Sequence, residues 1–223
     1  MSATPRRDGE ATRQKLLRAA LELYTTAGFR DTTTPAIAER AGVAEGTIYR
    51  HFSGKEDLLN AVYRAAQRWA LGVITDEGEH TARARDRLQR IAHRLLEAAE
   101  HDPAGARMVL DFHDDRYLDD KSREAAREVR DALQQVVAAG KSDGLVRAGP
   151  ADLWVAVWLS VVAFAVERVC AKEWTPDHPQ ANQAVEAAWN AIRQGETPSA
   201  PSASPAPRSS PPSGPARDPP GAR

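Results

Sequence analysis

Few side chains in this sequence have the spacing that catalysis or metal binding requires. An activated nucleophile, paired carboxylates or a glycine-rich phosphate loop would each leave a recognisable pattern, and neither G-x-G-x-x-G nor the full phosphate-loop motif G-x-x-x-x-G-K-[ST] occurs. The single cysteine, Cys170, falls within a predicted helix with no neighbouring histidine. His113, Asp114 and Asp115 form a small cluster, but acidic residues at a helix end are usually solvated. We therefore expect no enzyme activity, no cofactor and no metal site.

One spacing points to a specific chemistry: two short helical patterns, 34–41 and 45–52, are joined by a tight turn. Gly42 suits this turn because a positive φ costs a residue with a Cβ atom about 1 to 2 kcal/mol. Val43 then fills the space between the two helices. The pattern from 33 to 52 is that of a helix-turn-helix, whose second helix enters the major groove of DNA while the first crosses the phosphate backbone.

The rest of the chain must position this motif, and its apolar residues recur at helical spacing almost throughout. Thr34 and Pro35 are expected to open the second helix, and Ser53 and Glu56 have the form of a capping box for the fourth. Such a chain buries its apolar stripes helix on helix, so we predict an all-α fold without strands. The nine predicted helices span about 12–27, 34–41, 45–52, 56–72, 85–100, 104–114, 120–139, 151–174 and 180–193.

The formal net charge of -1, from 30 basic and 31 acidic residues, hides an uneven distribution. Residues 1–70 hold 11 basic and 8 acidic side chains, a net of +3, whereas 71–195 hold 16 and 21, a net of -5. Residues 196–223 hold 3 and 2, a net of +1. A basic surplus at one end is consistent with nucleic-acid contact by that end, although three charges also fit an ordinary solvated surface.

The segment TTPAIAERAGVAEGTIYRHFSGK, from Thr33 to Lys55, together with the upstream TRQKLLRAALELYTTAGF, closely resembles the DNA-binding domain of the tetracycline-repressor (TetR) family of bacterial transcription regulators. The resemblance covers about residues 10–70, which we take as a three-helix DNA-binding domain. It implies that 71–195 form a helical bundle for ligand binding and dimerisation; these residues fit that role in length and helicity only. The implied function is that of a repressor released from a palindromic operator by a small hydrophobic ligand. A TetR-like activator, a ligand-independent regulator and a helical scaffold without DNA binding remain alternatives.

Site residues carry over from the family only in the first domain. Thr33 and Thr34 match the start of the family's helix that contacts phosphate, and threonine hydroxyls together with free helix amides suit that contact. Thr47 can bond a base edge or contact a thymine methyl group, and Glu45 can accept from the amino group of cytosine. For Tyr49, contact with DNA and packing within the domain are both open. Arg50 either contacts DNA or points to the side of the recognition helix. The predicted DNA contacts are Thr33, Thr34, Glu45, Gly46, Thr47, Tyr49, Arg50, His51 and Lys55, with Ile48 and Phe52 expected in the core.

The same resemblance implies a homodimer in which the last two helices of each chain form a four-helix bundle. The nearly all-apolar stretch Leu153–Val166 has more apolar sides than the core of one small bundle requires, although burial inside one subunit is the alternative. The candidate interface residues are Trp158, Val162, Val166, Ala184, Ala188 and Trp189.

A ligand pocket is implied within the middle helices. Its candidate lining residues are Met108, Phe112, His113, Trp154 and Trp158, with Asp111 and Glu167 as further polar candidates. Trp154 and Trp158 lie one helical turn apart, so they can stack on a flat ligand or equally form the dimer core. The sequence identifies neither the effector nor the operator.

Composition sets the remaining expectations. Residues 196–223 contain nine of the 15 prolines, so we predict a disordered Pro/Ser-rich tail, either a solvated extension or a polyproline ligand for another protein. The start of the sequence has no apolar stretch of signal-peptide length, and the longest apolar run, 153–166, is short of the roughly 18 to 20 residues that span a bilayer. We therefore expect a cytoplasmic, nucleoid-associated protein with no membrane contact.

Overall fold

The computed structural model describes residues 5–76, 82–112 and 115–195. Within these ranges every regular element is a helix, apart from one isolated antiparallel bridge between Val146 and Arg193. The predicted tail, 196–223, lies outside the described residues, as do His113 and Asp114. The all-α prediction is confirmed.

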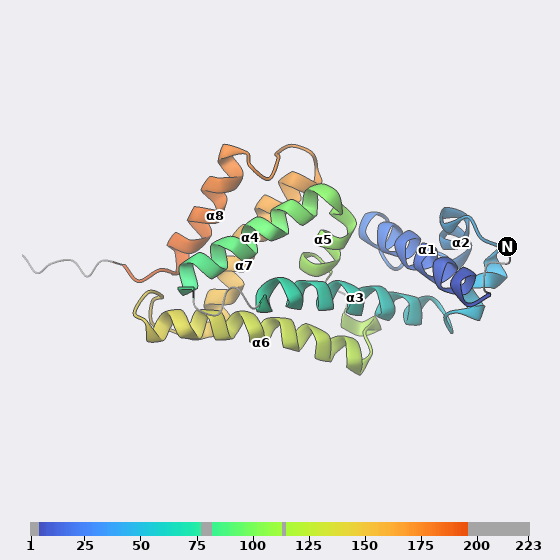
Figure 1. The fold of residues 1–223 in the computed structure, drawn as a ribbon, viewed down its shortest axis with the longest axis horizontal. Coiled ribbons are helices and arrows are strands. Elements are labelled where there is room, and N and C mark those ends of the chain that lie inside the picture. The colour runs from blue at the N-terminus through green and yellow to red at the C-terminus, as the bar shows by residue number, and fades with distance from the viewer. Residues whose placement is uncertain (1–4, 77–81, 113–114, 196–223) are drawn as a thin grey trace, which may run out of the picture.

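The helix-turn-helix lies at one end of the molecule (Figure 1). The motif is formed by α2 (Thr34–Ala41) and η1 (Glu45–Arg50). We call these two helices together with α1 (Pro5–Thr26) the small unit, and α3 (Lys55–Thr75) follows it. The last of these helices runs from the small unit into the rest of the chain, which we call the body. A single continuous helix therefore joins the two parts of the molecule.

The body packs its remaining helices around this long connection. In Figure 1, α6 lies alongside α3, and the α7–α8 and α4–α7 pairs pack against each other. Each of the nine predicted helices is present among the described residues, and a single turn, η3, is additional. The elements of the body are α4 (Ala84–His101), α5 (Pro103–Leu110), η3 (Asp115–Tyr117), α6 (Asp120–Ser142), α7 (Ala151–Cys170) and α8 (Pro179–Ile192).

Two predicted helix caps are wrong in detail. Thr33, not Thr34, occupies the cap position of α2, and its hydroxyl accepts from the amide of Ala36 at 3.3 Å. The expected box between Ser53 and Glu56 does not form, because Gly54 takes the cap position of α3. Instead, the amide and hydroxyl of Ser53 both donate to the carboxylate of Asp57, one residue further along. Both helices begin within one residue of the predicted place.

The helix ends in the body also differ from the sequence prediction. The short α5 ends at Leu110, so Asp111 and Phe112 lie beyond it, and α7 ends at Cys170 rather than Trp174. Lys172 takes a left-handed conformation with φ of 62° directly after α7, which a continuing helix does not allow.

The structure has two hydrophobic cores, and the one in the small unit includes side chains from the body. The core of the small unit, the predicted DNA-binding end, is centred on Leu16, Ile37 and Ile48, but it also contains Met108 from α5 and Leu118 from the segment before α6. Both side chains are almost fully buried. The body therefore supplies part of the small unit's core.

The helix α7 is apolar on two sides. Its inner side contains Val155, Trp158 and Val162, all buried, while Leu153 and Phe164 are 48% and 54% exposed. At 20 residues, with a mean hydropathy of 1.8 over an 18-residue window, the whole helix has the length and composition of a membrane-crossing one, although its apolar run 153–166 is shorter. Its packing against α4, α6 and α8 is that of a core helix in a helical bundle.

The turn of the motif provides a direct test of the local fold. Gly42 has φ of 68°, and a Cβ atom there would meet no atom within 4 Å, so only the backbone opposes a substitution. We expect Gly42→Ala to lower the free energy of unfolding by about 1 kcal/mol, measured by urea denaturation.

The matched control is Gly72→Ala in α3, where a Cβ atom also meets open space and φ is not positive. Alanine is the better helix former, so this variant should be as stable as the wild type or more stable by up to about 1 kcal/mol. Equal stability of Gly42→Ala and the wild type would contradict the assigned turn.

Candidate nucleic-acid interface

The first predicted contacts lie where α2 meets η1. Thr33 is exposed and caps α2, and the hydroxyl of Thr34 is 3.3 Å from that of Tyr49. This hydroxyl pair links the start of α2 to η1, across the Gly42 turn. The arrangement presents threonine hydroxyls and the first amides of α2 together, which is the group set that binds phosphate at a helix start.

The recognition element η1 is a 3₁₀ helix instead of the predicted α-helix. The amides of Thr47 and His51 donate to the carbonyls of Ala44 and Ile48, three residues earlier, each at 2.9 Å. Ala44 provides no side-chain cap to this element, and Gly46 is a poor helix former. A short, tight helix is the result.

The three-residue period of η1 decides which side chains face the same way. Residues three apart are eclipsed in a 3₁₀ helix, so Thr47 and Arg50 share one edge while Gly46 and Tyr49 share another. Tyr49 is 57% exposed and Arg50 is exposed, whereas Ile48 is fully buried. Each of the two edges therefore has one exposed side chain, and the buried Ile48 side chain holds η1 against the core.

The other predicted contacts and the predicted core around η1 are also located. Glu45 is exposed at the start of η1, and His51 is half-buried at its end. Phe52 is buried, which with Ile48 confirms the predicted core of the motif. The structure thus brings eight of the nine predicted contacts to one region around η1 and the start of α2, whereas the ninth, Lys55, is bonded to the loop before α2.

Lys55 has an internal role that sequence reasoning missed. Its ammonium group donates to the carbonyls of Arg30 and Thr32 at 3.1 and 2.7 Å, and lies 4.4 Å from the centre of the Phe29 ring. The hydroxyl of Tyr24 in turn donates to the Lys55 carbonyl at 3.0 Å. The side chain therefore secures the loop between α1 and α2, and two of its three N–H groups are already used.

A chain of charged side chains connects α2 to the body. The guanidinium of Arg40 donates to Glu22 at 2.8 Å, and Arg18 donates to Glu22 and to Asp102 at 2.8 and 2.7 Å. The hydrogen bond from Arg40 holds the pKa of Glu22 below its usual range, against the opposing effect of partial burial. Asp102 also caps α5 by accepting from the amide of Gly105. The chain thus runs from α2 through α1 to the start of α5.

Asn60 forms a second link between the domains. It is 4% exposed, and its side-chain amide donates to the carbonyls of Glu56 and Tyr117 and accepts from the amide of Asp119, each at 2.8 Å. The Tyr117 ring packs on Phe29, with ring centres 4.4 Å apart. The single turn η3 is therefore fixed to α3 on one side and to the α1–α2 loop on the other.

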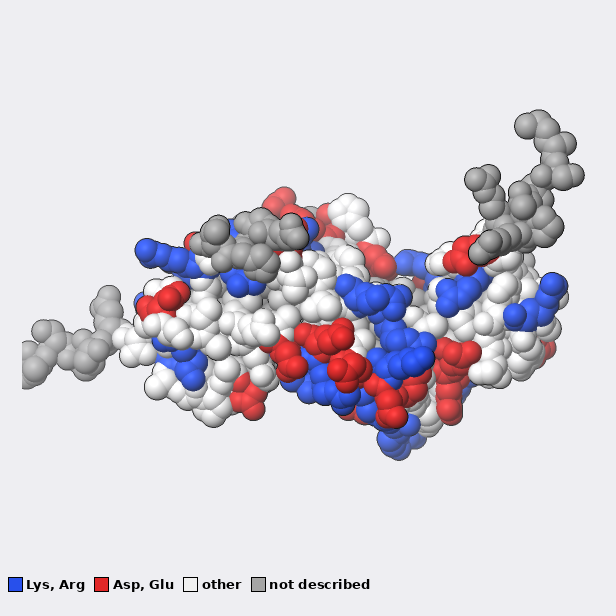
Figure 2. All heavy atoms as spheres, turned by 60° about the horizontal axis from the view of Figure 1, so that its bottom comes forward, with Lys and Arg blue, Asp and Glu red and all other residues white. Residues whose placement is uncertain are grey.

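Charge on the surface is mixed. On the face shown in Figure 2, acidic and basic side chains alternate over the middle of the molecule, and a few basic ones stand apart at the end that carries α1 and α2. The sequence surplus of +3 in residues 1–70 is therefore not visible on this face as one large basic patch.

The predicted pocket residues are not brought together. Met108 is fully buried in the core of the DNA-binding end, and Trp158 is 1% exposed in the body core. Trp154 is half-buried and packs against the Gly149 backbone. Phe112 lines a depression of about 530 Å³ between α3, α5, α6 and α7, which is also lined by charged side chains, and together with Asp111 it lines a second hollow beside Tyr24 and Phe29. His113 lies outside the described residues, and contact of the other candidates with a ligand stays a prediction.

The predicted dimer surface is also wrong for most of its residues. Within a single subunit, Trp158, Val162, Val166, Ala188 and Trp189 are each at most 5% exposed and form part of the body core. Among the predicted residues, only Ala184 is half-buried. Side chains that are already enclosed cannot provide the surface of a contact between two copies, so any such surface must use the other side of these helices.

The geometry defines a class of protein: a helix-turn-helix that presents an exposed hydroxyl and basic edge, joined by one long helix to an all-helical body. Residues 16–62 match the tetR family of bacterial regulatory proteins, and residues 71–194 match the tetracyclin repressor-like C-terminal domain. The chain belongs to the TetR family and is a DNA-binding transcriptional regulator.

Individual relatives agree with this assignment. The chain is 28% identical over 138 residues to the HTH-type transcriptional repressor KstR2 of Mycobacterium tuberculosis, covering 57% of this chain and 68% of the relative. It is 25% identical over 137 residues to the fatty acid metabolism regulator protein of Bacillus subtilis, covering 60% and 71%. A TetR family transcription regulator from Marinobacter aquaeolei has the same fold, with a TM-score of 0.72, 21% identity, and coverage of 85% and 100%.

The internal bonds of Lys55 lead to a test. Replacing it with methionine keeps the aliphatic stem and removes the ammonium, which leaves two backbone carbonyls without their charged donor. We expect Lys55→Met to lower the free energy of unfolding by about 1 to 3 kcal/mol, measured by urea denaturation without DNA.

Arg50→Met is the control, because Arg50 is exposed on η1 and its removal should change stability by less than about 0.5 kcal/mol. If Lys55→Met unfolds like the wild type, the ammonium does not secure the loop and the side chain acts only on DNA.

Proposed function

We propose that this protein is a homodimeric repressor that binds a palindromic operator and leaves it when a small hydrophobic ligand binds. The observation that carries the proposal is η1, which exposes Tyr49 and Arg50 and leaves Thr47 half-buried beside them, while Ile48 is fully buried. The relative KstR2 is named a transcriptional repressor, which supports the sign of regulation. We place this activity in the bacterial cytoplasm, at the nucleoid. A TetR-like activator and a ligand-independent regulator use the same DNA contacts.

Different edges of the interface have different tasks in this proposal. Thr47 reads a base edge or a thymine methyl group, and exposed Glu45 accepts from a cytosine amino group. Tyr49, Arg50 and the hydroxyls at the start of α2 hold phosphates and set the register. Lys55 contributes to DNA binding mainly by fixing the loop before α2.

The proposed dimer uses the outward side of the last two helices. On α7 the side chains of Leu153, Val157 and Phe164 follow one another at three- to four-residue spacing, with Ser160 between them. On α8, Ala184, Ala187 and Ala191 form a flat side. An exposed apolar surface of this kind indicates a contact with another protein, and a two-fold dimer would pair it with itself. Two copies then present two η1 elements to the half-sites of one operator.

The DNA face is tested on an operator selected from genomic fragments of the source organism. We expect Thr47→Ala to weaken binding about 5- to 150-fold and to relax the preference at one position in each half-site. Arg50→Ala should weaken binding to all sequences alike and reduce the slope of log affinity against log salt by about 2, one phosphate per subunit.

The control is Arg130→Ala, which removes an exposed charge from α6 in the body and should change neither the preference nor the salt slope. Full affinity and unchanged selectivity of a Thr47→Ala, Arg50→Ala double variant would show that η1 is not the reading element. If the wild type selects no genomic fragment, the protein does not bind DNA sequence-specifically, and the alternative of a helical scaffold without DNA binding would replace the proposal.

The dimer surface is tested in solution by sedimentation. We expect Leu153→Glu combined with Phe164→Glu to produce a folded monomer, because two charges per subunit would face each other across an apolar contact. Ala138→Glu, an exposed change on α6, should leave the dimer intact. A double variant that still sediments as a dimer would place the interface elsewhere.

A further inference from the structure

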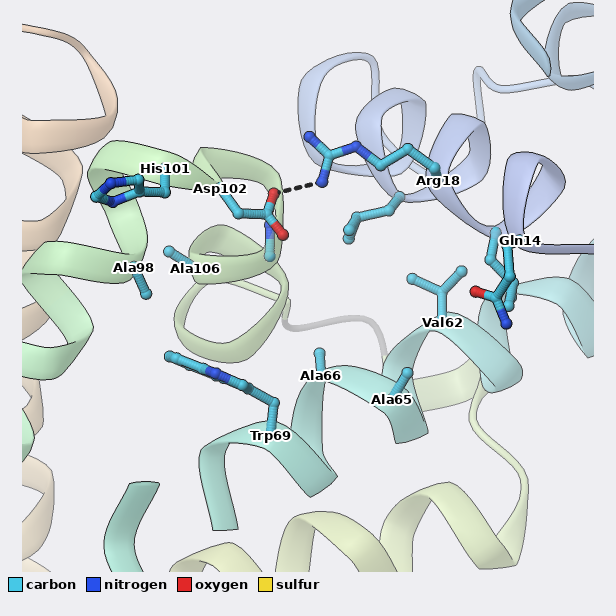
Figure 3. A pocket seen from close by; sticks show the side chains of 13 residues that line it. Gln14, Arg18, Val62, Ala65, Ala66, Trp69, Ala98, His101, Asp102 and Ala106 are labelled. Atoms are coloured by element: carbon cyan, nitrogen blue, oxygen red, sulfur yellow. Dashed lines mark hydrogen bonds and ion pairs between the residues drawn. The ribbon is translucent and has the colours of Figure 1, made fainter. Parts of the chain in front are cut away.

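A cavity lies at the junction of the DNA-binding end and the body. It has a volume of about 520 Å³, within the range of about 300 to 1,000 Å³ that holds drug-sized ligands. Its walls come from α1, the connecting helix α3, α4 and the start of α5, so both units contribute to it (Figure 3). None of the pocket residues predicted from the sequence lines it.

The lining is mostly apolar and is shaped by small residues. Ala66 on α3, Ala98 on α4 and Ala106 on α5 leave space between helices that would otherwise touch. Figure 3 shows the ring of Trp69 extending beneath Ala98 and Ala106 across this space. Trp69 is 41% exposed, which is unusual for a large aromatic side chain that has a cavity to occupy. A flat apolar molecule would cover this ring.

The charges at the rim compensate each other. Arg18 and Asp102 face the cavity from opposite units, joined at 2.7 Å, so they attract no further ion strongly. They retain hydrogen-bonding capacity, because both bonds to Asp102 use Oδ1 and leave Oδ2 available. His101, whose Nδ1 bonds the Glu97 carbonyl, also lines the cavity. A charged ligand would lose its hydration here without gaining a counter-ion.

We propose that this junction cavity binds an uncharged, mainly hydrocarbon ring molecule with a single hydrogen-bonding group. The rings lie on Trp69 between the alanines, and the polar group bonds the Arg18–Asp102 pair or His101. This inference rests on the proposed function only in assigning the molecule as the effector.

The position of the cavity explains how such a molecule would act on DNA binding. The ligand contacts α1 on one side and α4 and α5 on the other, and the Arg18–Asp102 pair spans the same gap. A molecule that fits one separation of these helices better than another shifts the equilibrium between them. Through Glu22 and Arg40 the change reaches α2. A coupling of 5- to 150-fold in operator affinity is the usual range.

The test uses two fluorescent probes with the same ring skeleton, applied to the full chain without DNA. N-phenyl-1-naphthylamine is uncharged and has one N–H group, whereas 1-anilinonaphthalene-8-sulfonate adds a sulfonate. We expect one site per subunit that binds the uncharged probe at least ten times more tightly. Equal or tighter binding of the sulfonate would overturn the assigned ligand class.

The location is tested by filling the cavity. Ala66→Leu and Ala98→Leu should each weaken binding of the uncharged probe at least tenfold, while Ala138→Leu on the surface of α6 should not. Trp69→Ala removes an exposed side chain, so it keeps the fold and should also weaken binding, even where a leucine variant proves unstable. Wild-type affinity in all three cavity variants, or loss of binding on Leu159→Trp in the body depression, would place the site elsewhere.

The probe measurement is independent of DNA, so the two proposals can fail separately. Probe binding without operator binding would contradict the proposed function and leave the cavity assigned. In the wild type, saturating uncharged probe should weaken operator binding at least fivefold, and Ala66→Leu should abolish this response. Operator affinity that is unchanged by bound probe would show that the cavity does not control DNA binding.

Discussion

Side chains of the body complete the hydrophobic core of the DNA-binding end, and the rest of the structure depends on this. Met108 and Leu118 belong to the body by sequence, yet they are buried among the side chains that hold η1 and α2. Apolar burial of this kind contributes about 1.5 to 3 kcal/mol for each large side chain, more than an exposed ion pair supplies. The helix-turn-helix is therefore not an independent unit on a flexible connection, and its position follows α5 and the start of α6.

Polar contacts differ between the two sides of the junction between the DNA-binding end and the body. Asn60 is bonded on three sides, to α3, η3 and the start of α6, and Tyr117 rests on the loop that Lys55 secures. On the opposite side of α3, Arg18 reaches Asp102 across the junction cavity. One side of the junction is closed by bonded and packed groups, whereas the other is open and spanned by an exposed ion pair.

Sequence reasoning succeeded where the signal is local. Gly42 and the pattern from 45 to 52 identified the motif, and Ile48 and Phe52 are in its core as predicted. It failed where contacts are long-range: nothing near Lys55 in the sequence shows that its ammonium would meet the carbonyls of the α1–α2 loop. The α7 helix is apolar on two sides, so periodicity could not decide which stripe faces inward, and the chosen interface residues were the buried ones. The junction cavity arises from alanines on three helices, which a sequence does not bring together.

The most direct test of this contribution from the body is hydrogen exchange of the full chain carrying Leu118→Ala, a change far in sequence from any DNA contact. If the body completes the core of the DNA-binding end, backbone amides of α2 and η1 should lose protection, and operator affinity should fall with them. Increased exchange confined to α5 and α6, with α2, η1 and operator binding unchanged, would contradict the account.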